Sequence, residues 1–251
     1  MIDVIIFGNG NVATQLAKAF YKSAICNLKQ VYSRSTPSTY FSKKGIATTQ
    51  DIKHIKNADL YLIAISDDAI KSFSKQLHFQ GKLVVHTSGS VSMDELECNA
   101  NKGVFYPLQT ISKNKKISFK NIPICLEASN KKDLDLLTTV ANSISNKVHY
   151  INSEQRKSLH VSAVFVNNFT NHLYKIANDL CDEYKVDFAI LKPLINETAK
   201  KIKTLAPKDA QTGPAIRNDK KTIKKHLALL NKNQHEIYTL LSNSISKQTK
   251  D

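Results

Sequence analysis

The sequence predicts an α/β domain with a doubly wound sheet, followed by an all-helical domain. Over the first 151 residues, short apolar runs rich in β-branched residues alternate with segments whose apolar residues recur at helical spacing. This alternation is typical of a parallel sheet covered by helices on both faces. From Asn152 onward no convincing strand appears, whereas long helical patterns do. We therefore expect two domains, residues 1–151 and residues 152–251.

The expected strands are buried runs that stop at glycine or at polar residues. The first covers residues 2–7, and a helix follows from Val12 to about Ser23. Further strands are expected at residues 28–32, 60–65, 83–85, 103–106, 122–126 and 148–151. Helices are expected at about 67–76 and 133–144 in the first domain, and at about 153–184, 188–205, 219–231 and 234–246 in the second.

Composition excludes several classes of protein. With 251 residues, of which 41% are hydrophobic, the chain is expected to fold rather than to be disordered. No apolar run approaches the roughly 20 residues that cross a membrane, and no secretory leader is visible, so we expect a cytoplasmic protein. The four cysteines are far apart and lack metal-ligand spacing, which predicts reduced thiols and no metal site. They are Cys26, Cys98, Cys125 and Cys181.

The basic charge favours an anionic partner. The formal net charge is +15, which suits a phosphorylated cofactor, an acidic metabolite or nucleic acid. Because the basic residues are spread along the chain and no nucleic-acid-binding module is visible, we do not expect nucleic acid. Only three of the 36 basic residues are arginines: Arg34, Arg156 and Arg217. The planar guanidinium binds phosphate and carboxylate groups better than lysine does, so arginine positions are candidate anion contacts.

A glycine-rich turn follows the first expected strand. Residues 8–13 fit the dinucleotide-binding pattern G-x-G-x-x-A. Gly8 permits a tight turn, Gly10 lets the backbone approach a pyrophosphate, and Ala13 allows the helix to pack closely on the strand. The helix N-terminus adds free N–H groups. The alternative is a tight turn without a ligand. The expected cofactor contacts in this turn are Gly8, Asn9, Gly10, Asn11 and Val12.

The end of the second strand indicates which dinucleotide binds. NAD-preferring sites carry an acidic residue there, which binds the ribose 2′-hydroxyl. Here the strand runs into Ser33, Arg34 and Ser35, a cation between two hydroxyl groups. We therefore expect NADP, with these three residues around its 2′-phosphate. The alternative is a surface arginine in a polar loop.

Two later strand ends supply further candidates. Ser66 follows the strand at 60–65 and either contacts the cofactor or, like Asp67, caps the next helix. Thr87 and Ser88 lie beside Gly89 at the end of the strand at 83–85. Because glycine lets backbone and ligand approach closely, we expect these two hydroxyl groups to border the nicotinamide.

The helix at 153–184 combines an apolar run with polar residues. Residues 161–166 are apolar nearly all round, which predicts a buried helix. At 100° per residue, Asn167 and Asn171 each fall within about 20° of His160, and Asn168 is displaced from it by about 80°. This polar stripe is either part of a site or a set of side chains satisfied by caps, neighbouring helices or water.

The loop at 210–219 contains the third arginine. Arg217 follows Gly213 and Pro214 and precedes Asp219, which is expected to cap the next helix. Arg217 either binds a substrate carboxylate or phosphate, or pairs with Asp219.

Together these motifs resemble a family of bacterial proteins with a Rossmann-like N-terminal domain and a C-terminal domain of unknown function numbered 2520. The resemblance rests on residues 8–13, 32–35, 86–90, 105–110, 160, 167–169 and 212–219, with His226 beyond them. It implies that the chain is related to the 6-phosphogluconate and β-hydroxyacid dehydrogenases, to pyrroline-5-carboxylate reductase and to the coenzyme F420-dependent NADP oxidoreductases. It also implies a C-terminal domain of the 6-phosphogluconate dehydrogenase type, dimerisation through that domain, and a substrate held between domains.

One departure from these relatives bears on mechanism. β-Hydroxyacid dehydrogenases carry Lys-x-x-Asn-Asn on the corresponding helix. If Asn167 and Asn168 match the asparagines, Val164 replaces the lysine. His160, one turn earlier, is then the expected acid/base group, because imidazole exchanges protons near neutral pH.

The functional expectation is an NADP-dependent oxidoreductase acting on a CH–OH or CH–NH group. It would transfer hydride between nicotinamide and a small, anionic carbonyl or imine compound. The expected catalytic residues are His160, Asn168 and Ser88. The expected substrate contacts are Asn167, Arg217 and Gln109. The alternative is a non-catalytic NADP(H)-binding sensor or regulator.

Overall fold

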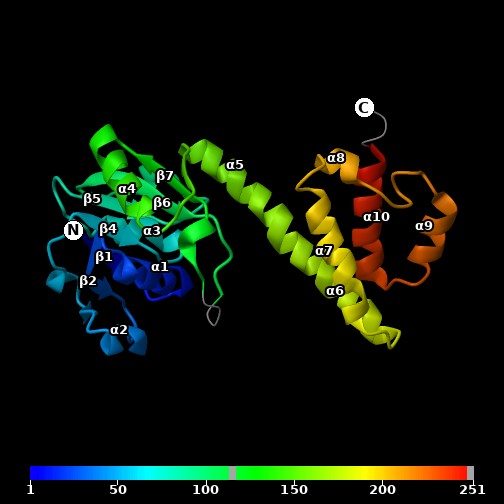
Figure 1. The fold of residues 1–251 in the computed structure, drawn as a ribbon, viewed down its shortest axis with the longest axis horizontal. Coiled ribbons are helices and arrows are strands. Elements are labelled where there is room, and N and C mark those ends of the chain that lie inside the picture. Colours follow the sequence, from blue (N-terminus) through cyan, green and yellow to red (C-terminus); the bar gives the residue numbers. More distant parts are fainter. Residues whose placement is uncertain (113–116, 248–251) are drawn as a thin grey trace. The chain divides into compact units, whose positions relative to one another are not determined.

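A computed structural model of the chain describes residues 1–112 and 117–247. By its internal contacts the chain divides into two compact units, Met1–Asn167 and Asn168–Asp251. The first is an α/β unit, hereafter the sheet unit, and the second is the helical unit (Figure 1). This is the class of fold that the sequence predicts. None of the helices in the described ranges is long and apolar enough to span a membrane.

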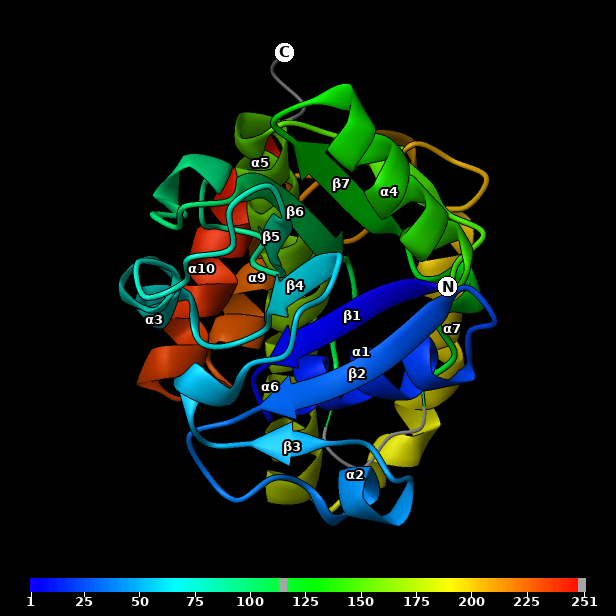
Figure 2. The same ribbon diagram turned by 90° about the vertical axis from the view of Figure 1, so that its left-hand side faces the viewer.

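The sheet unit contains eight strands in the order β3-β2-β1-β4-β5-β6-β7-β8, of which Figure 2 labels β3 to β7. They are β1 (Ile2–Phe7), β2 (Cys26–Tyr32), β3 (Thr48–Thr49), β4 (Leu60–Ile63), β5 (Leu83–His86), β6 (Asn101–Pro107), β7 (Ile124–Ala128) and β8 (Val148–Tyr150). All neighbouring strands pair in parallel except β6 and β7, which are antiparallel. The chain order reverses between β1 and β4, and ligands of doubly wound sheets bind at such a switch point.

Helices cover both faces of this sheet. They are α1 (Asn11–Lys22), α2 (Thr39–Lys43), α3 (Asp67–Ser74) and α4 (Lys131–Asn142), with short 3-10 helices η1 (Ile52–His54), η2 (Met93–Glu95) and η3 (Phe119–Asn121). Alternate residues of β1 enter different hydrophobic clusters. Val4 and Ile6 pack with residues of α1 and α4, whereas Ile5 and Phe7 pack with residues of α3. This two-sided burial follows from the period of two along a strand and explains why β1 has no polar face.

The helical unit begins within a helical segment of the chain. That segment comprises α5 (Ser153–Ala163), the π-helix η4 (Val164–Phe169) and α6 (Thr170–Glu183). The remaining elements are η5 (Phe188–Leu191), α7 (Lys192–Lys201), α8 (Pro207–Ala210), α9 (Lys220–Leu227) and α10 (Lys232–Lys247). No strand occurs between residues 168 and 247, the described part of this unit. The sequence expectation of a strand-free second half is confirmed.

The division between the compact units falls within η4 rather than at residue 151. The strands do end at Tyr150, and Asn152 begins α5 with the expected capping box to Gln155. However, Arg156 on α5 is only 1% exposed and forms an ion pair with Glu127 of β7. This contact attaches the first half of α5 to the sheet. A functional boundary at 151/152 stays a prediction.

Two expectations for the helix at 153–184 are wrong. Its apolar run is not buried in the chain, because Phe165 is 62% and Val166 is 74% exposed. The contacts that hold α5 to the sheet come from another face, which carries Arg156 and His160. The polar stripe counted at 100° per residue does not persist either, because η4 has more residues per turn than an α-helix.

Candidate active site

The glycine turn has the geometry that a dinucleotide requires. Gly8 follows β1 with φ +131°, and a Cβ there would lie 2.2 Å from the carbonyl oxygen of Ala64, so only glycine fits. Gly10 is the N-cap residue of α1, and a Cβ at Gly10 would meet no atom within 4 Å among the described residues. Val12 packs against the core. The turn therefore leaves open space in front of the N-terminus of α1, where an anion is stabilised.

The two asparagines of the turn hold neighbouring loops. The Asn9 amide donates a hydrogen bond to the carbonyl oxygen of Thr36 at 2.9 Å, and its side-chain oxygen accepts one from the backbone N–H of Ser38 at 3.1 Å. The Asn11 amide donates to the carbonyl oxygen of Ile111 at 3.2 Å. Asn9 thus fixes the loop after β2 that carries Arg34. Direct cofactor contacts by these two side chains stay predictions.

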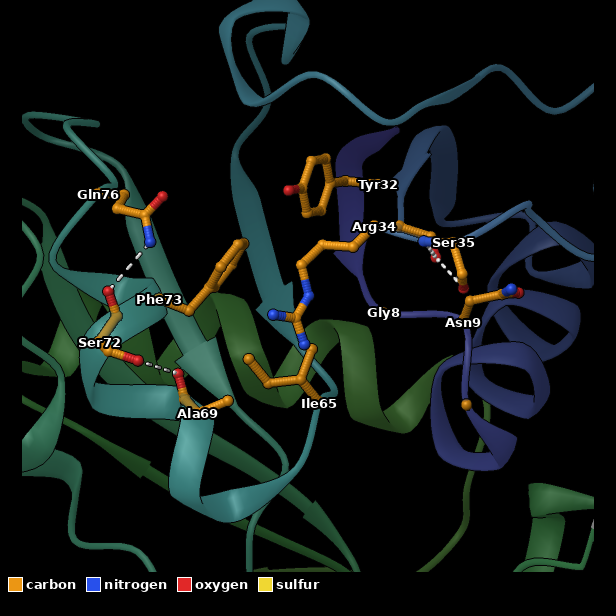
Figure 3. A pocket seen from close by; sticks show the side chains of 12 residues that line it. Gly8, Asn9, Tyr32, Arg34, Ser35, Ile65, Ala69, Ser72, Phe73 and Gln76 are labelled. Carbon is orange, nitrogen blue, oxygen red and sulfur yellow. Dashed lines mark hydrogen bonds between the residues drawn. The ribbon is translucent and has the colours of Figure 1, made fainter.

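A cavity of about 560 Å³ lies beside the glycine turn (Figure 3). Its lining residues come from the glycine turn, from the end of β2 with the following loop, and from residues 65–76, which include α3. They are Gly8, Asn9, Gly10, Tyr32, Ser33, Arg34, Ser35, Ile65, Ala69, Ser72, Phe73 and Gln76. No carboxylate is among them. The Arg34 side chain reaches into this cavity between Phe73 and the turn at Gly8 (Figure 3).

The charge of the cavity suits a phosphate group. Arg34 is exposed and forms no ion pair with a carboxylate in the part of the chain that the structure describes. The Ser33 hydroxyl lies 3.3 Å from the Ser35 hydroxyl and also accepts the backbone N–H of Ser35. A guanidinium beside hydroxyl groups, without a competing acid, matches the recognition of a ribose 2′-phosphate. These residues therefore fit NADP.

The α3 wall of the cavity was not anticipated from the sequence. Ile65, Ala69 and Phe73 provide apolar surface, and Ser72 and Gln76 provide polar groups. These residues follow the β4 strand at the switch point, which is the only sequence signal for them. Ser66 is the N-cap residue of α3, but its side chain makes no capping hydrogen bond. Contact of Ser66 with the cofactor stays a prediction.

The loop after β5 is held by its own polar groups. His86 is fully buried, and burial, followed by the positive charge of Arg156, lowers the pKa of His86 to about 4, so it is neutral at pH 7. Its Nδ1 accepts the backbone N–H of Ser88 at 3.1 Å.

Two hydroxyl groups of this loop have partners within the protein. The Ser88 hydroxyl oxygen accepts backbone N–H groups of Ser90 and Val91 at 3.1 and 3.0 Å. The Thr87 hydroxyl donates to the carbonyl oxygen of Ile63 at 3.4 Å. Catalytic or nicotinamide contacts of Ser88 and Thr87 stay predictions.

His160 lies against this loop together with an unanticipated tyrosine. Nδ1 of His160 is 3.0 Å from the hydroxyl oxygen of Tyr106, which lies near the end of β6. A Cβ at Gly89 would lie 2.5 Å from Nδ1 of His160 and 2.8 Å from Cζ of Tyr106. Gly89 is therefore needed because two aromatic rings approach the backbone here. Burial raises the pKa of Tyr106 to about 12, so its phenol keeps its proton at neutral pH.

Arg156, which the sequence marks only as a candidate anion contact, is the structural anchor of this region. Besides its ion pair with Glu127, Arg156 donates to the carbonyl oxygen of Val91 at 2.6 Å and to the Ser153 hydroxyl at 3.1 Å. These contacts connect α5, β7 and the loop after β5. The rarity of arginine was the available signal, but the sequence does not show which distant carboxylate it meets.

The remaining predicted site residues lie elsewhere. Gln109 is exposed, and its side-chain oxygen accepts the backbone N–H of Thr110 at 2.8 Å. Asn167 and Asn168 are exposed on η4 and have further polar or ring contacts. Arg217, in the helical unit, is exposed and has no ion-pair partner within the described ranges. The substrate contacts predicted for Gln109, Asn167 and Arg217 stay predictions, as does the catalytic role predicted for Asn168.

Asp219 has the predicted capping role. It caps α9 by accepting hydrogen bonds from the backbone N–H and the hydroxyl of Thr222 at 3.0 and 2.7 Å, which lowers the pKa of Asp219. The Arg217–Asp219 ion pair considered above is not among those in the structure. No cluster of three or more potential metal ligands occurs in the ranges 1–112 and 117–247.

The chain is similar to known proteins in both sequence and fold. The profile of DUF2520, a domain of unknown function, matches residues 122–245. A structure described as an NADP oxidoreductase from Bacteroides fragilis is 41% identical, with TM-score 0.88 and 98% of each chain covered. A Thermotoga maritima protein is 19% identical with TM-score 0.73, again over 98% of each chain. No curated protein matches the sequence.

An imine reductase from Myxococcus stipitatus, solved with NADP⁺, has the same fold. It is 14% identical, with TM-score 0.69, and the match covers 99% of this chain and 94% of that one. Its bound cofactor is of the class that the glycine turn and Arg34 predict for the present chain. The glycine turn, the doubly wound sheet, the matching helical region and the close similarity to the Bacteroides fragilis protein show that the chain belongs to the family of Rossmann-like proteins with a DUF2520 domain.

Proposed function

We propose that this protein is an NADP-dependent oxidoreductase that transfers hydride between nicotinamide and a small, anionic carbonyl or imine compound. The observation that carries the proposal is the carboxylate-free cavity beside the glycine turn, into which Arg34 points. The similarity to an NADP oxidoreductase at 41% identity supports it. The imine reductase similarity shows the fold, and an imine substrate is our inference.

The chain's own residues would divide the work as follows. The backbone at Gly8 and Gly10 would accommodate the pyrophosphate, and Arg34 would bind the 2′-phosphate. The bound cofactor supplies the hydride chemistry. His160 would donate a hydrogen bond or a proton at the substrate atom where negative charge develops. Arg217 would bind the anionic end of the substrate through its two parallel N–H groups.

A non-catalytic NADP(H)-binding protein is the second candidate. It is favoured by Val164, which stands where the β-hydroxyacid dehydrogenases have their acid/base lysine. Such a protein would bind NADPH but would not oxidise it, whichever compound is offered as substrate. One experiment distinguishes the two candidate functions.

The test is NADPH oxidation with a panel of small 2-oxo acids and imines, for the native chain and for His160→Gln. We expect turnover by the native enzyme and a loss of about a hundredfold or more in His160→Gln, because a general acid contributes roughly that much. NADPH affinity should be unchanged. His54→Gln is the control, since His54 lies exposed on η1. NADPH binding without turnover of any compound would favour the second candidate, and full activity of His160→Gln would remove His160 from the mechanism.

Two further expectations belong to this proposal. A homodimer formed through the helical region would cover the exposed residues Phe165, Val166 and Phe169, which are more than half exposed in one chain. We also infer a cytoplasmic protein, which is supported by four cysteines that are all unpaired. Nucleic acid and membranes are not proposed as partners.

A further inference from the structure

The contact between Tyr106 and His160 bears on how the histidine acts. Tyr106 is 8% exposed, and within the described residues its hydroxyl group has one hydrogen-bonding partner, Nδ1 of His160 at 3.0 Å. The phenol keeps its proton, since burial raises the pKa of Tyr106 to about 12. The role of the tyrosine therefore depends on the direction in which its hydroxyl hydrogen points.

The cost of leaving a buried donor without an acceptor indicates that this hydrogen points at Nδ1 of His160. A buried hydroxyl hydrogen without an acceptor costs about 1–3 kcal/mol, whereas an unused lone pair on the same oxygen costs less. If Tyr106 donates, Nδ1 of the neutral imidazole carries no hydrogen. The ring proton then resides on Nε2, because a neutral imidazole has one donor and one acceptor nitrogen.

The ring of His160 is held from two further directions. Gly89 lies so close that even a methyl group would overlap Nδ1 and Cγ of His160, at 2.5 and 2.8 Å. Arg156 lies one helical turn earlier on α5 and is anchored to Glu127 of β7 and to the loop after β5. The backbone that carries His160 is thus fixed to the sheet, and its ring is in contact with Gly89 and Tyr106.

We propose that Tyr106 is a positioning residue that donates a hydrogen bond to Nδ1 of His160 and so makes Nε2–H the group that His160 offers to a substrate. The substrate half of this inference rests on the proposed function. The tautomer half does not, because it concerns the free protein. A donor fixed before the substrate arrives needs no reorganisation when charge develops, which is the advantage of preorganised sites.

The chain provides a matched control in its other tyrosine–histidine pair. In the helical unit, Nδ1 of His226 lies 2.8 Å from the hydroxyl oxygen of Tyr238. Tyr106→Phe and Tyr238→Phe each remove one hydroxyl group and leave the ring. Each variant therefore serves as the control for the other.

The experiment is nitrogen NMR of the imidazoles in ¹⁵N-histidine-labelled protein at about pH 8, where an ordinary histidine is neutral. His160→Gln identifies the His160 signals. We expect native His160 to show a protonated Nε2 and a bare Nδ1. In Tyr106→Phe these signals should move toward values averaged over the two tautomers, while those of His226 stay in place. In Tyr238→Phe we expect the signals of His226 to move and those of His160 to stay in place.

Two results would overturn the proposal: a native His160 protonated on Nδ1, or signals that are unchanged in Tyr106→Phe. NADPH titration and circular dichroism check that each variant is folded. If Tyr106→Phe does not fold, Gly89→Ala provides a second way to separate the two rings and should cause the same change at His160.

Turnover adds an independent measurement. With any substrate found in the panel, Tyr106→Phe should lower kcat about three- to tenfold, the range expected for one hydrogen bond, and leave NADPH affinity unchanged. Tyr238→Phe should leave kcat unchanged. If the panel gives no turnover, the proposed function fails, whereas the NMR result still decides the role of Tyr106.

Discussion

The two compact units differ in how much apolar surface they bury within one chain. Among the described residues, the buried hydrophobic side chains lie in the sheet unit, with Ala215 as the single exception. The helical unit instead exposes many large apolar residues, including Ile190, Leu194 and Leu240, each more than 60% exposed. The sheet unit thus has a core of its own. Exposed apolar surface of this extent is typical of an interface.

This contrast bears on cofactor binding and on the proposed substrate binding, which depend on different units. The cavity beside the glycine turn lies in the unit with the complete core, so its geometry is set by strands and helices that need no partner. The proposed substrate ligand Arg217 lies in the unit whose apolar residues remain exposed. We therefore expect cofactor binding to be less sensitive to assembly than turnover.

The largest expected effect is loss of stability on cutting into the sheet core. Leu62→Ala, at a fully buried position of β4, should lower the free energy of unfolding by about 2–5 kcal/mol, because it leaves a cavity. Leu240→Ala, at a position 70% exposed in one chain, should change it by less than about 0.5 kcal/mol in the monomer. Urea unfolding followed by circular dichroism measures both. A loss below 1 kcal/mol for Leu62→Ala would contradict the contrast.

The next effect concerns assembly. Val166→Glu places a charge at the most exposed apolar residue of η4, and if a second copy covers this face, burying that charge should weaken the dimer by about a hundredfold or more. Light scattering across a dilution series measures the mass. Ile25→Glu, an exposed apolar position of the sheet unit, is the control and should leave the mass unchanged. A native protein that is monomeric at all concentrations would refute the dimer.

Much of the fold could be predicted because its signals are local. The buried runs at residues 2–7 and 83–85 and the glycine turn each carry their information within a few residues. The antiparallel pairing of β6 and β7 was not predicted, because an apolar run does not show the direction in which it pairs. The π-helix was missed for a similar reason, since its residues also suit an α-helix. The exposure of Phe165 could not be predicted, because hydrophobicity shows a preference for burial and not which surface provides it.

The site divides in the same way. Gly8 and Arg34 were found because their spacing from the strands follows a known pattern. Tyr106 and Arg156 were missed because their partners lie 54 and 29 residues away, at His160 and Glu127. Contacts over such separations depend on which strands become neighbours in the sheet.

The most direct test of the proposal that NADP binds in the cavity beside the glycine turn is a fluorescence titration with NADPH and with NADH. It compares the native chain with Arg34→Ala and with Arg217→Ala, a matched control in the helical unit. We expect the native chain to prefer NADPH. Arg34→Ala should bind NADPH about ten- to a hundredfold more weakly, as for loss of a charged hydrogen bond, and NADH nearly as before, while Arg217→Ala should bind both normally. Equal binding of NADPH by the native chain and Arg34→Ala would contradict the assignment of this cavity, and binding of neither nucleotide would mean that the glycine turn is only structural.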